Sequence, residues 1–251
     1  MLTRPFSRRW LLATALVLLA AAVMVRLGIW QLDRLEQRRA FNARVSEQQE
    51  AQPLVLDADT IHLDLYSMEY RQVSVSGEYL PEDEIVLRNQ VWNTEFGGQL
   101  GVKLFTPLLI EGTDEAILVE RGWIPEENAG GEQRAIYREN GLIALQGQLR
   151  RPETDFQLGF HPDPTMSPGE RRLDAWNNLD LERLASQMDT TLLPVYLQHF
   201  PEGVQTNPPY ATIPELELSE GPHLGYAIQW FSFAAILLLG YPFYVRKQEA
   251  L

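Results

Sequence analysis

Two long apolar stretches dominate the pattern of hydrophobic and polar positions, one near each end of the chain. The first, Trp10 to Val25, has sixteen residues without a charge, and four more uncharged residues follow Arg26. The second, Leu224 to Val245, is uncharged over 22 residues. As a helix it would span about 33 Å, which exceeds a hydrocarbon core about 30 Å thick. The pattern predicts transmembrane helices over residues 10–30 and 223–245.

The first apolar stretch also fits a cleavable signal peptide, because basic Arg8 and Arg9 precede it and Ala20 to Ala22 offer small residues for cleavage. The apolar run is long for a signal peptide, and it continues through Val23 to Val25. An uncleaved anchor is therefore the preferred interpretation, with the signal peptide as the alternative.

Between the two spans the pattern changes twice. Residues 31–49 are charged and free of Gly and Pro, with apolar residues roughly at helical spacing, so we expect an amphipathic helix that ends before Pro53. Beyond Pro53, alternating apolar and polar residues predict strands. We expect one hairpin over residues 71–80 and 84–92, a second over residues 101–110 and 116–124, and further strands over 141–150 and 192–200.

Helices are a minor part of this central region. The sequence predicts a short polar helix over 126–137 and another over 179–188, with Asp180 as its N-cap. Residues 151–171, rich in Pro and Gly, should form a long irregular loop. The expected fold class is α+β: two transmembrane helices flanking a mainly antiparallel β domain with a few helices.

Charge suggests how the chain is oriented. Arg4, Arg8 and Arg9 precede the first span, and Arg246 and Lys247 follow the second. Basic flanks favour the cytoplasm, so we expect residues 1–9 and 246–251 to be cytoplasmic and residues 31–222 to form a periplasmic domain. The expected location is the bacterial plasma (inner) membrane. Several arginines just after the first span depart from this rule, but long loops cross largely regardless of charge.

The central region is strongly acidic and has no thiol chemistry. Residues 45–222 contain 11 Lys or Arg and 31 Asp or Glu, a net formal charge of 11 − 31 = −20. Such a surface argues against nucleic acid and leaves the spans as the contact with membrane lipid. The chain has no cysteine, which excludes disulfides, thiolate metal sites and cysteine nucleophiles.

His223 stands at the edge of the second span. On a helix, Tyr226, Ala227, Trp230 and Ala234 share its face, at i+3, i+4, i+7 and i+11. A neutral imidazole can give one axial bond to a haem iron, and this face could support a flat macrocycle. The alternative is an interfacial histidine beside the aromatic belt of a membrane helix.

At the outer end of the first span, Trp30, Arg34 and Arg38 recur at helical spacing. These arginines could pair with carboxylates such as haem propionates. The alternative, a tryptophan anchor with arginines that extend toward the interface, is preferred from the residues alone.

Arg121, Gly122 and Trp123 form a third conspicuous group, in which we expect a turn that holds the arginine against a carboxylate. We interpret it as structural. His62, His161 and His199 are scattered without acidic partners at metal-ligand spacing, and HExxH, GxSxG and P-loop patterns are absent, so an enzyme has little support.

In order, "LGIWQLDRLEQR", "YRQVSVSGEYL", "GVKLFTPLLI", "ILVERGWIP", "DAWNNLDLERLA", "PVYLQ" and "PHLGYAIQWFSFA" resemble the Surfeit-locus family of cytochrome c oxidase assembly factors. The likeness covers nearly the whole chain. Gly221 and Pro222 stand where asparagines are expected, and Gln229 where threonine is usual.

This resemblance implies a non-catalytic membrane factor that helps haem a reach subunit I of a haem-copper oxidase, beside haem a synthase. It implies His223 as the ligand of the haem iron, with Trp230 on the same face. Trp30 and Arg34 belong to a shared motif without an established role. A cofactor-free scaffold and a membrane-anchored enzyme are the rival hypotheses.

Overall fold

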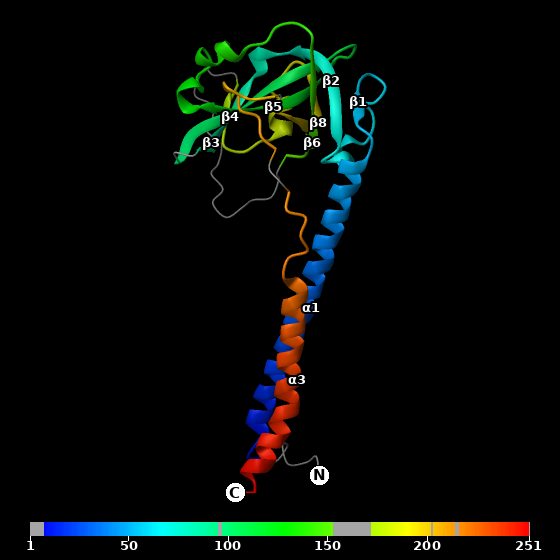
Figure 1. Ribbon diagram of the computed structural model, residues 1–251, viewed down its shortest axis with the longest axis vertical. Coiled ribbons are helices and arrows are strands. Elements are labelled where there is room, and N and C mark those ends of the chain that lie inside the picture. Colours follow the sequence, from blue (N-terminus) through cyan, green and yellow to red (C-terminus); the bar gives the residue numbers. More distant parts are fainter. Residues whose placement is uncertain (1–7, 95–96, 153–171, 202, 214–215, 251) are drawn as a thin grey trace. The chain divides into compact units, whose positions relative to one another are not determined.

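The computed structural model of the chain describes residues 8–94, 97–152, 172–201, 203–213 and 216–250 (Figure 1). The chain divides into two compact units. One unit, residues 1–44 and 216–251, includes most of the two long helices, and the other, residues 45–215, includes the β strands. Two apolar helices flank a β-rich domain with few helices, so the predicted fold class is confirmed.

The two long helices are α1 (Leu11–Glu50) and α3 (His223–Gln248). Both are long and apolar enough to cross a membrane. Only 17% and 11% of their most apolar windows are buried, unlike the core helix of a soluble protein. Helix α1 continues through the charged residues after the first span, so the amphipathic extension that ends before Pro53 is confirmed.

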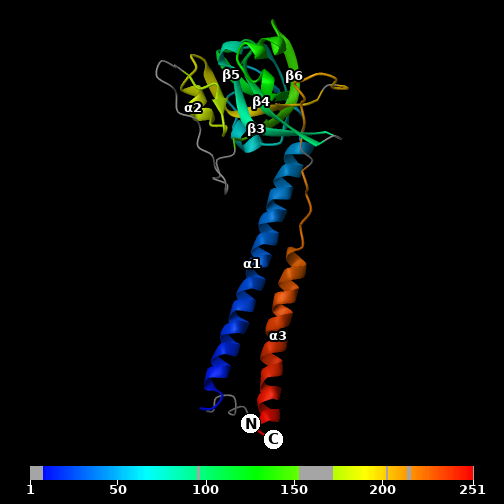
Figure 2. The same ribbon diagram turned by 90° about the vertical axis from the view of Figure 1, so that its left-hand side faces the viewer.

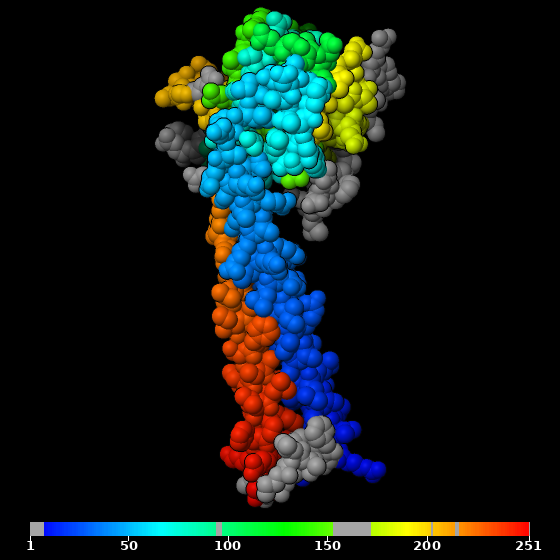
Figure 3. Space-filling model, turned by 90° about the vertical axis from the view of Figure 1, so that its right-hand side faces the viewer, coloured from blue at the N-terminus to red at the C-terminus, as the bar shows by residue number. Residues whose placement is uncertain are grey.

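Helices α1 and α3 run antiparallel and in contact (Figures 2 and 3). At one end Thr14 hydrogen-bonds Tyr241 over 2.8 Å, and at the other Gln31 lies 2.8 Å from His223. Small residues allow this approach, because a Cβ on Gly28 would lie 2.7 Å from the ring of Phe231.

Several buried positions of both helices recur every seven residues. They are Thr14, Ala21, Gly28 and Leu35 in α1, and Ala227 and Ala234 in α3; Val45 and Val245 are also buried but do not follow this spacing. A spacing of seven equals two turns at 3.5 residues per turn, which keeps one stripe of each helix against its partner in a left-handed crossing.

The β domain is built on one eight-stranded sheet, ordered β1-β2-β6-β8-β5-β4-β3-β7. Strand β2 pairs with both β6 and β4, so β2, β6, β8, β5 and β4 close into a five-stranded ring. Most pairs are antiparallel, and β1–β2, β3–β7 and β5–β8 are parallel. The strands are β1 (Leu54–Leu56), β2 (Gln72–Tyr79), β3 (Ile85–Thr94), β4 (Gly97–Ile110), β5 (Glu115–Pro125), β6 (Ile143–Arg150), β7 (Ala175–Trp176) and β8 (Thr191–His199).

Alternation along the strands fills the ring with aliphatic side chains. In β2 the buried residues are Val73, Val75, Gly77 and Tyr79, the period of two that a strand with one buried face requires. Val73, Val75 and Tyr79 join buried residues of the other ring strands, such as Leu108, in one cluster. Full burial of an aliphatic side chain contributes about 1.5–3 kcal/mol, so this cluster is a main source of the stability of the domain.

The predicted hairpin between residues 71–80 and 84–92 is wrong. Strand β4 has 14 residues, and it pairs with β3 from Gly97 to Phe105 and with β2 from Leu108 to Ile110. Strands β2 and β3 therefore lie one after the other along β4, and the 3-10 helix η3 (Pro81–Asp83) connects them. The second predicted hairpin, β4 with β5, is confirmed.

The remaining elements largely follow the sequence pattern. Helix α2 (Leu181–Ala185) begins after Asp180, whose carboxylate accepts a hydrogen bond from the Arg183 amide over 3.0 Å, so the predicted N-cap is confirmed. The helix expected over 126–137 is two 3-10 helices, η4 (Glu126–Asn128) and η5 (Gln133–Tyr137). A further 3-10 helix, η2 (Leu65–Met68), precedes β2. Most of the predicted loop lies in residues 153–171, outside the described residues.

Candidate functional site

His223 is the first residue of α3, so its side chain lies at the end of the predicted span. Pro222 precedes it as the N-cap, and Gly221 before that has a φ of +68°, a conformation that favours glycine. The turn therefore fixes the direction from which the chain enters the helix.

One ring nitrogen of His223 is held by α1. Its Nδ1 lies 2.8 Å from Oε1 of Gln31. An amide oxygen only accepts hydrogen bonds, so Nδ1 carries the proton and donates it. In a neutral imidazole this leaves the lone pair on Nε2, the form in which histidine binds metals.

The Nε2 edge of the same ring faces Gly221. A Cβ placed on this glycine would lie 3.5 Å from Cδ2 and 3.6 Å from Nε2 of His223. Within the described ranges no group of three His, Cys, Asp or Glu side chains could hold a metal ion. His223 can therefore offer one nitrogen, Nε2, as a metal ligand.

The other residues predicted on the His223 face lie in different surroundings. Ala227 is 1% exposed and packs in the contact with α1. Trp230 is half-buried and meets Phe233 edge-on at 6.2 Å, and Tyr226 is 47% exposed. While the helices are paired in this way, α1 covers the face on which we expected a macrocycle to lie.

Trp30 and Arg34 lie together on the exposed side of α1. The guanidinium of Arg34 is 5.6 Å from the Trp30 ring centroid, and its Nη1 donates to Gln37 over 3.0 Å. Both side chains are exposed. The structure thus joins these two residues to each other, and among the described residues neither hydrogen-bonds His223.

Three neighbouring side chains of α1 hold the segment that leads into α3. Arg38 donates to the carbonyl oxygens of Glu217 and Ser219, and Asn42 donates to that of Leu218 over 2.5 Å. Arg39 forms a two-pronged pair with the carboxylate of Glu220, at 2.7 and 2.8 Å. Sequence analysis missed Gln31, Arg39 and Asn42; the only available signal was an arginine-rich helix and an acidic stretch before Pro222.

The Glu220 carboxylate is exposed, and its bond to Arg39 lowers its pKa below the ordinary value. The hydrogen bond is the main cause, since it favours the charged form.

Arg121 lies buried in the β domain, 5% exposed, among acidic and aromatic groups. It lies 3.7 Å from a carboxylate oxygen of Glu84, pairs with Glu139, and stacks over the ring of Tyr79 at 4.6 Å. Glu84, also buried, accepts a further bond from Thr106 over 2.8 Å. A buried arginine so paired is an internal cross-link, since a lone charge there would be costly.

Gly122 and Trp123 lie in β5 and contact the segment that follows β8. Gly122 has a φ of +132°, and a Cβ there would lie 2.5 Å from the backbone of Tyr210. Trp123 exchanges two backbone hydrogen bonds with Tyr210, at 3.0 and 2.9 Å. Its ring stacks with those of Trp92 and Tyr210, at 6.0 and 6.2 Å. This group anchors the return segment.

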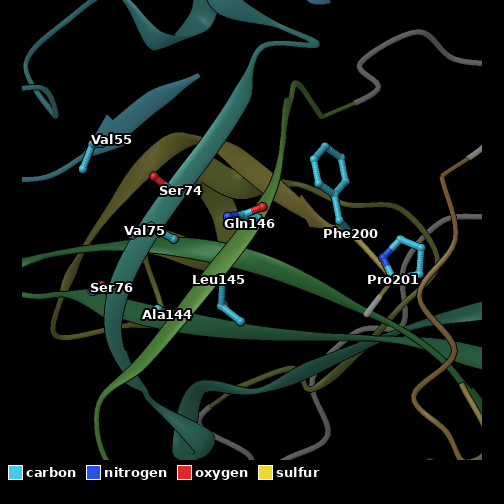
Figure 4. Close-up of a pocket in the computed structure, with 9 residues that line it drawn as sticks. All are labelled: Val55, Ser74, Val75, Ser76, Ala144, Leu145, Gln146, Phe200 and Pro201. Atoms are coloured by element: carbon cyan, nitrogen blue, oxygen red, sulfur yellow. The ribbon is translucent and has the colours of Figure 1, made fainter. Parts of the chain in front are cut away.

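Two hollows in the described part of the β domain are candidates for an active site. One, of about 280 Å³, lies on β2 and β6 and has no ionisable side chain in its lining (Figure 4). The other, of about 550 Å³, is lined in part by Arg121, Glu139 and His199. Its arginine is already paired with Glu139. The first lining has serine hydroxyls but no general base to activate them.

The sequence matches the profile of the SURF1 family over residues 18–235. The chain belongs to the SURF1 family. The match includes Gln31, Arg121 and His223.

Curated relatives in the SURF1 family extend over most of the chain. A SURF1-like protein of Monosiga brevicollis is 31% identical over 236 residues, which cover 88% of this chain and 83% of that protein. A SURF1-like protein of the bacterium Rickettsia felis is 26% identical, covering 92% and 96%. The cytochrome oxidase assembly protein SHY1 of Saccharomyces cerevisiae is 31% identical over 111 residues, covering 44% and 28%.

Proposed function

We propose that this chain is a membrane-bound assembly factor for a haem-copper cytochrome c oxidase, and that it helps deliver haem a to subunit I. Membership of the SURF1 family and the name of the yeast relative support a role in oxidase assembly. Two helices long enough to cross a membrane support its location there. The observation that carries the haem assignment is the Nδ1 bond of His223, which leaves Nε2 with a lone pair.

In this proposal haem a is cargo rather than a resident cofactor. His223 supplies one axial bond through Nε2, and α1 keeps the inner face of the ring closed. A single protein ligand at the end of a span gives binding that can reverse, which transfer to a partner requires. The chain takes no catalytic step.

The proposed partners are oxidase subunit I, as receiver, and haem a synthase, as source. The two spans cross the bacterial inner membrane with both termini in the cytoplasm. The acidic domain then lies in the periplasm, where it contacts the partners. Its net charge of −20 supports docking to basic protein surfaces rather than to anionic lipid.

A complementation experiment tests the proposal. Cells that lack the protein would receive the wild-type gene, His223→Ala or His62→Ala, and the haem a content of the purified oxidase would be measured. His62 is an exposed histidine of the β domain and serves as the matched control. We expect reduced haem a with His223→Ala and wild-type content with His62→Ala.

A cofactor-free scaffold is the second candidate, and the burial of Ala227 against α1 favours it, since this burial removes the predicted haem surface. Full rescue of oxidase haem content by His223→Ala would select the scaffold and reject haem delivery through this residue.

A further inference from the structure

Gln31 is a polar residue in the stripe through which α1 contacts α3. Gly28 and Leu35, before and after it on this stripe, are buried, and Gln31 is half-buried. An amide that is half-buried against another helix is partly cut off from water, so a hydrogen-bond partner on that helix is favourable. The Gln31 side chain meets this need with His223, 192 positions away in the sequence.

A second hydrogen bond between α1 and α3 serves as the comparison, because it lies away from His223. Thr14 and Tyr241 share a hydrogen bond of 2.8 Å at the other end of the helix pair. Both bonds fix the register of α1 against α3. Only the bond from Gln31 reaches the histidine proposed to bind iron, so the two bonds can be compared in one protein.

The two edges of the His223 ring differ in a way that selects one tautomer. The Gln31 oxygen accepts a hydrogen bond from Nδ1–H, and this bond is lost if the proton moves to Nε2. At the Nε2 edge stands Gly221, which has no side chain to cover it. The arrangement holds the ring with its lone pair directed away from α1.

We infer that Gln31 is a positioning residue for haem binding: its side-chain oxygen fixes the tautomer and orientation of His223 so that Nε2 is the iron ligand. This inference rests on the haem delivery proposed above. A hydrogen-bonded partner on the far nitrogen is the usual means by which proteins orient a metal-binding histidine, and its loss typically weakens metal affinity about 10–100-fold.

The test uses the full chain, purified in detergent from cells that make no haem a, with its histidines labelled with ¹⁵N. Ring nitrogen shifts report which nitrogen of His223 carries the proton, and titration with haem a gives the affinity. Gln31→Leu removes the acceptor, Gln31→Glu keeps an oxygen at the same reach, and Thr14→Val removes the other interhelical bond.

We expect the wild type to hold the proton on Nδ1, and Gln31→Leu to show both tautomers and about 10–100-fold weaker haem binding. Gln31→Glu should restore the wild-type tautomer, and Thr14→Val should leave tautomer and affinity unchanged. A structural role alone would make Thr14→Val and Gln31→Leu equivalent.

The inference is overturned if Gln31→Leu keeps the wild-type tautomer. It is also overturned if the wild type binds haem a and Gln31→Leu binds it equally tightly. Failure of the proposed function has a different signature. In that case the wild type binds no haem, and the tautomer change in Gln31→Leu still shows whether Gln31 orients the ring.

Discussion

At the scale of single residues, the stability of the β domain depends on a few positions that require a particular backbone conformation or a particular charge. Gly122 combines a positive φ with close packing on Tyr210. Glu84 is a buried carboxylate shared by arginines. Substitution of either residue should lower the free energy of unfolding by a measurable amount.

Gly122→Ala should destabilise the domain by roughly 1–3 kcal/mol from backbone strain, with an added cost because the new Cβ meets Tyr210. The measurement is the free energy of unfolding in urea. Gly112→Ala is the matched control, because Gly112 also has a positive φ, +77°, but open space around the added Cβ. Equal losses in the two variants would show that contact with Tyr210 is unimportant.

Glu84→Gln should cost about 3–5 kcal/mol, because it leaves Arg121 and Arg134 buried with less compensating charge. Chemical denaturation measures the loss. Glu139→Gln removes a partner of Arg121 that is half exposed, so we expect a clearly smaller effect. A loss below 1 kcal/mol for Glu84→Gln would contradict the assigned role of this carboxylate.

The pair of Arg39 and Glu220 should respond to acid. The pKa of Glu220 is lowered by its hydrogen bond to Arg39, so the contact is present above the ordinary glutamate value of 4.5 and is lost as the pH falls through the lower folded value. Carboxyl ¹³C shifts would follow this titration. Arg39→Gln should return the pKa of Glu220 toward 4.5, and an unchanged titration would refute the pairing.

At the scale of elements, the contact between α1 and α3 depends on small residues at a spacing of seven. Gly28→Leu should separate the helices, because even a Cβ at this position lies 2.7 Å from the Phe231 ring. The chain has no cysteine, so cysteines introduced as Thr14→Cys and Tyr241→Cys can be joined selectively by a bifunctional thiol reagent that spans the length of the lost Tyr241 ring. We expect Gly28→Leu to reduce the cross-linking yield several-fold.

The control for this cross-linking experiment is Ile29→Leu, since Ile29 is 44% exposed on another side of α1. Its yield should match that of the parent pair. If Gly28→Leu also matches the parent, the close helix contact does not form in the membrane.

Elements are also where sequence reasoning succeeded and failed. Apolar length, alternation and capping residues predicted both long helices, most strands and the Asp180 cap, because these depend on neighbours along the chain. The predicted β2–β3 hairpin was wrong because the alternation within a strand does not show which strand it pairs with. Strand β4 is long enough to pair with both β2 and β3.

The same limit applies to the site. The spacing of three, four and seven residues from His223 describes a ligand face and a helix-packing face equally well, and Ala227 belongs to the second. Gln31 could not be linked to His223 from the sequence, because their contact depends on the register of two antiparallel helices.

At the scale of the whole molecule, the chain is a SURF1-family member with two helices of membrane-spanning length and an acidic β domain. The proposed delivery role places haem chemistry on the helices and partner recognition on the domain. The central claim is that His223, through Nε2, binds haem a.

The most direct test is the ratio of haem a to protein after purification of the full chain from cells that synthesise haem a. The account predicts a ratio near one for the wild type, and a ratio near zero for His223→Ala at equal yield of folded protein. A haem-free wild type, or equal haem content in the two proteins, would contradict it.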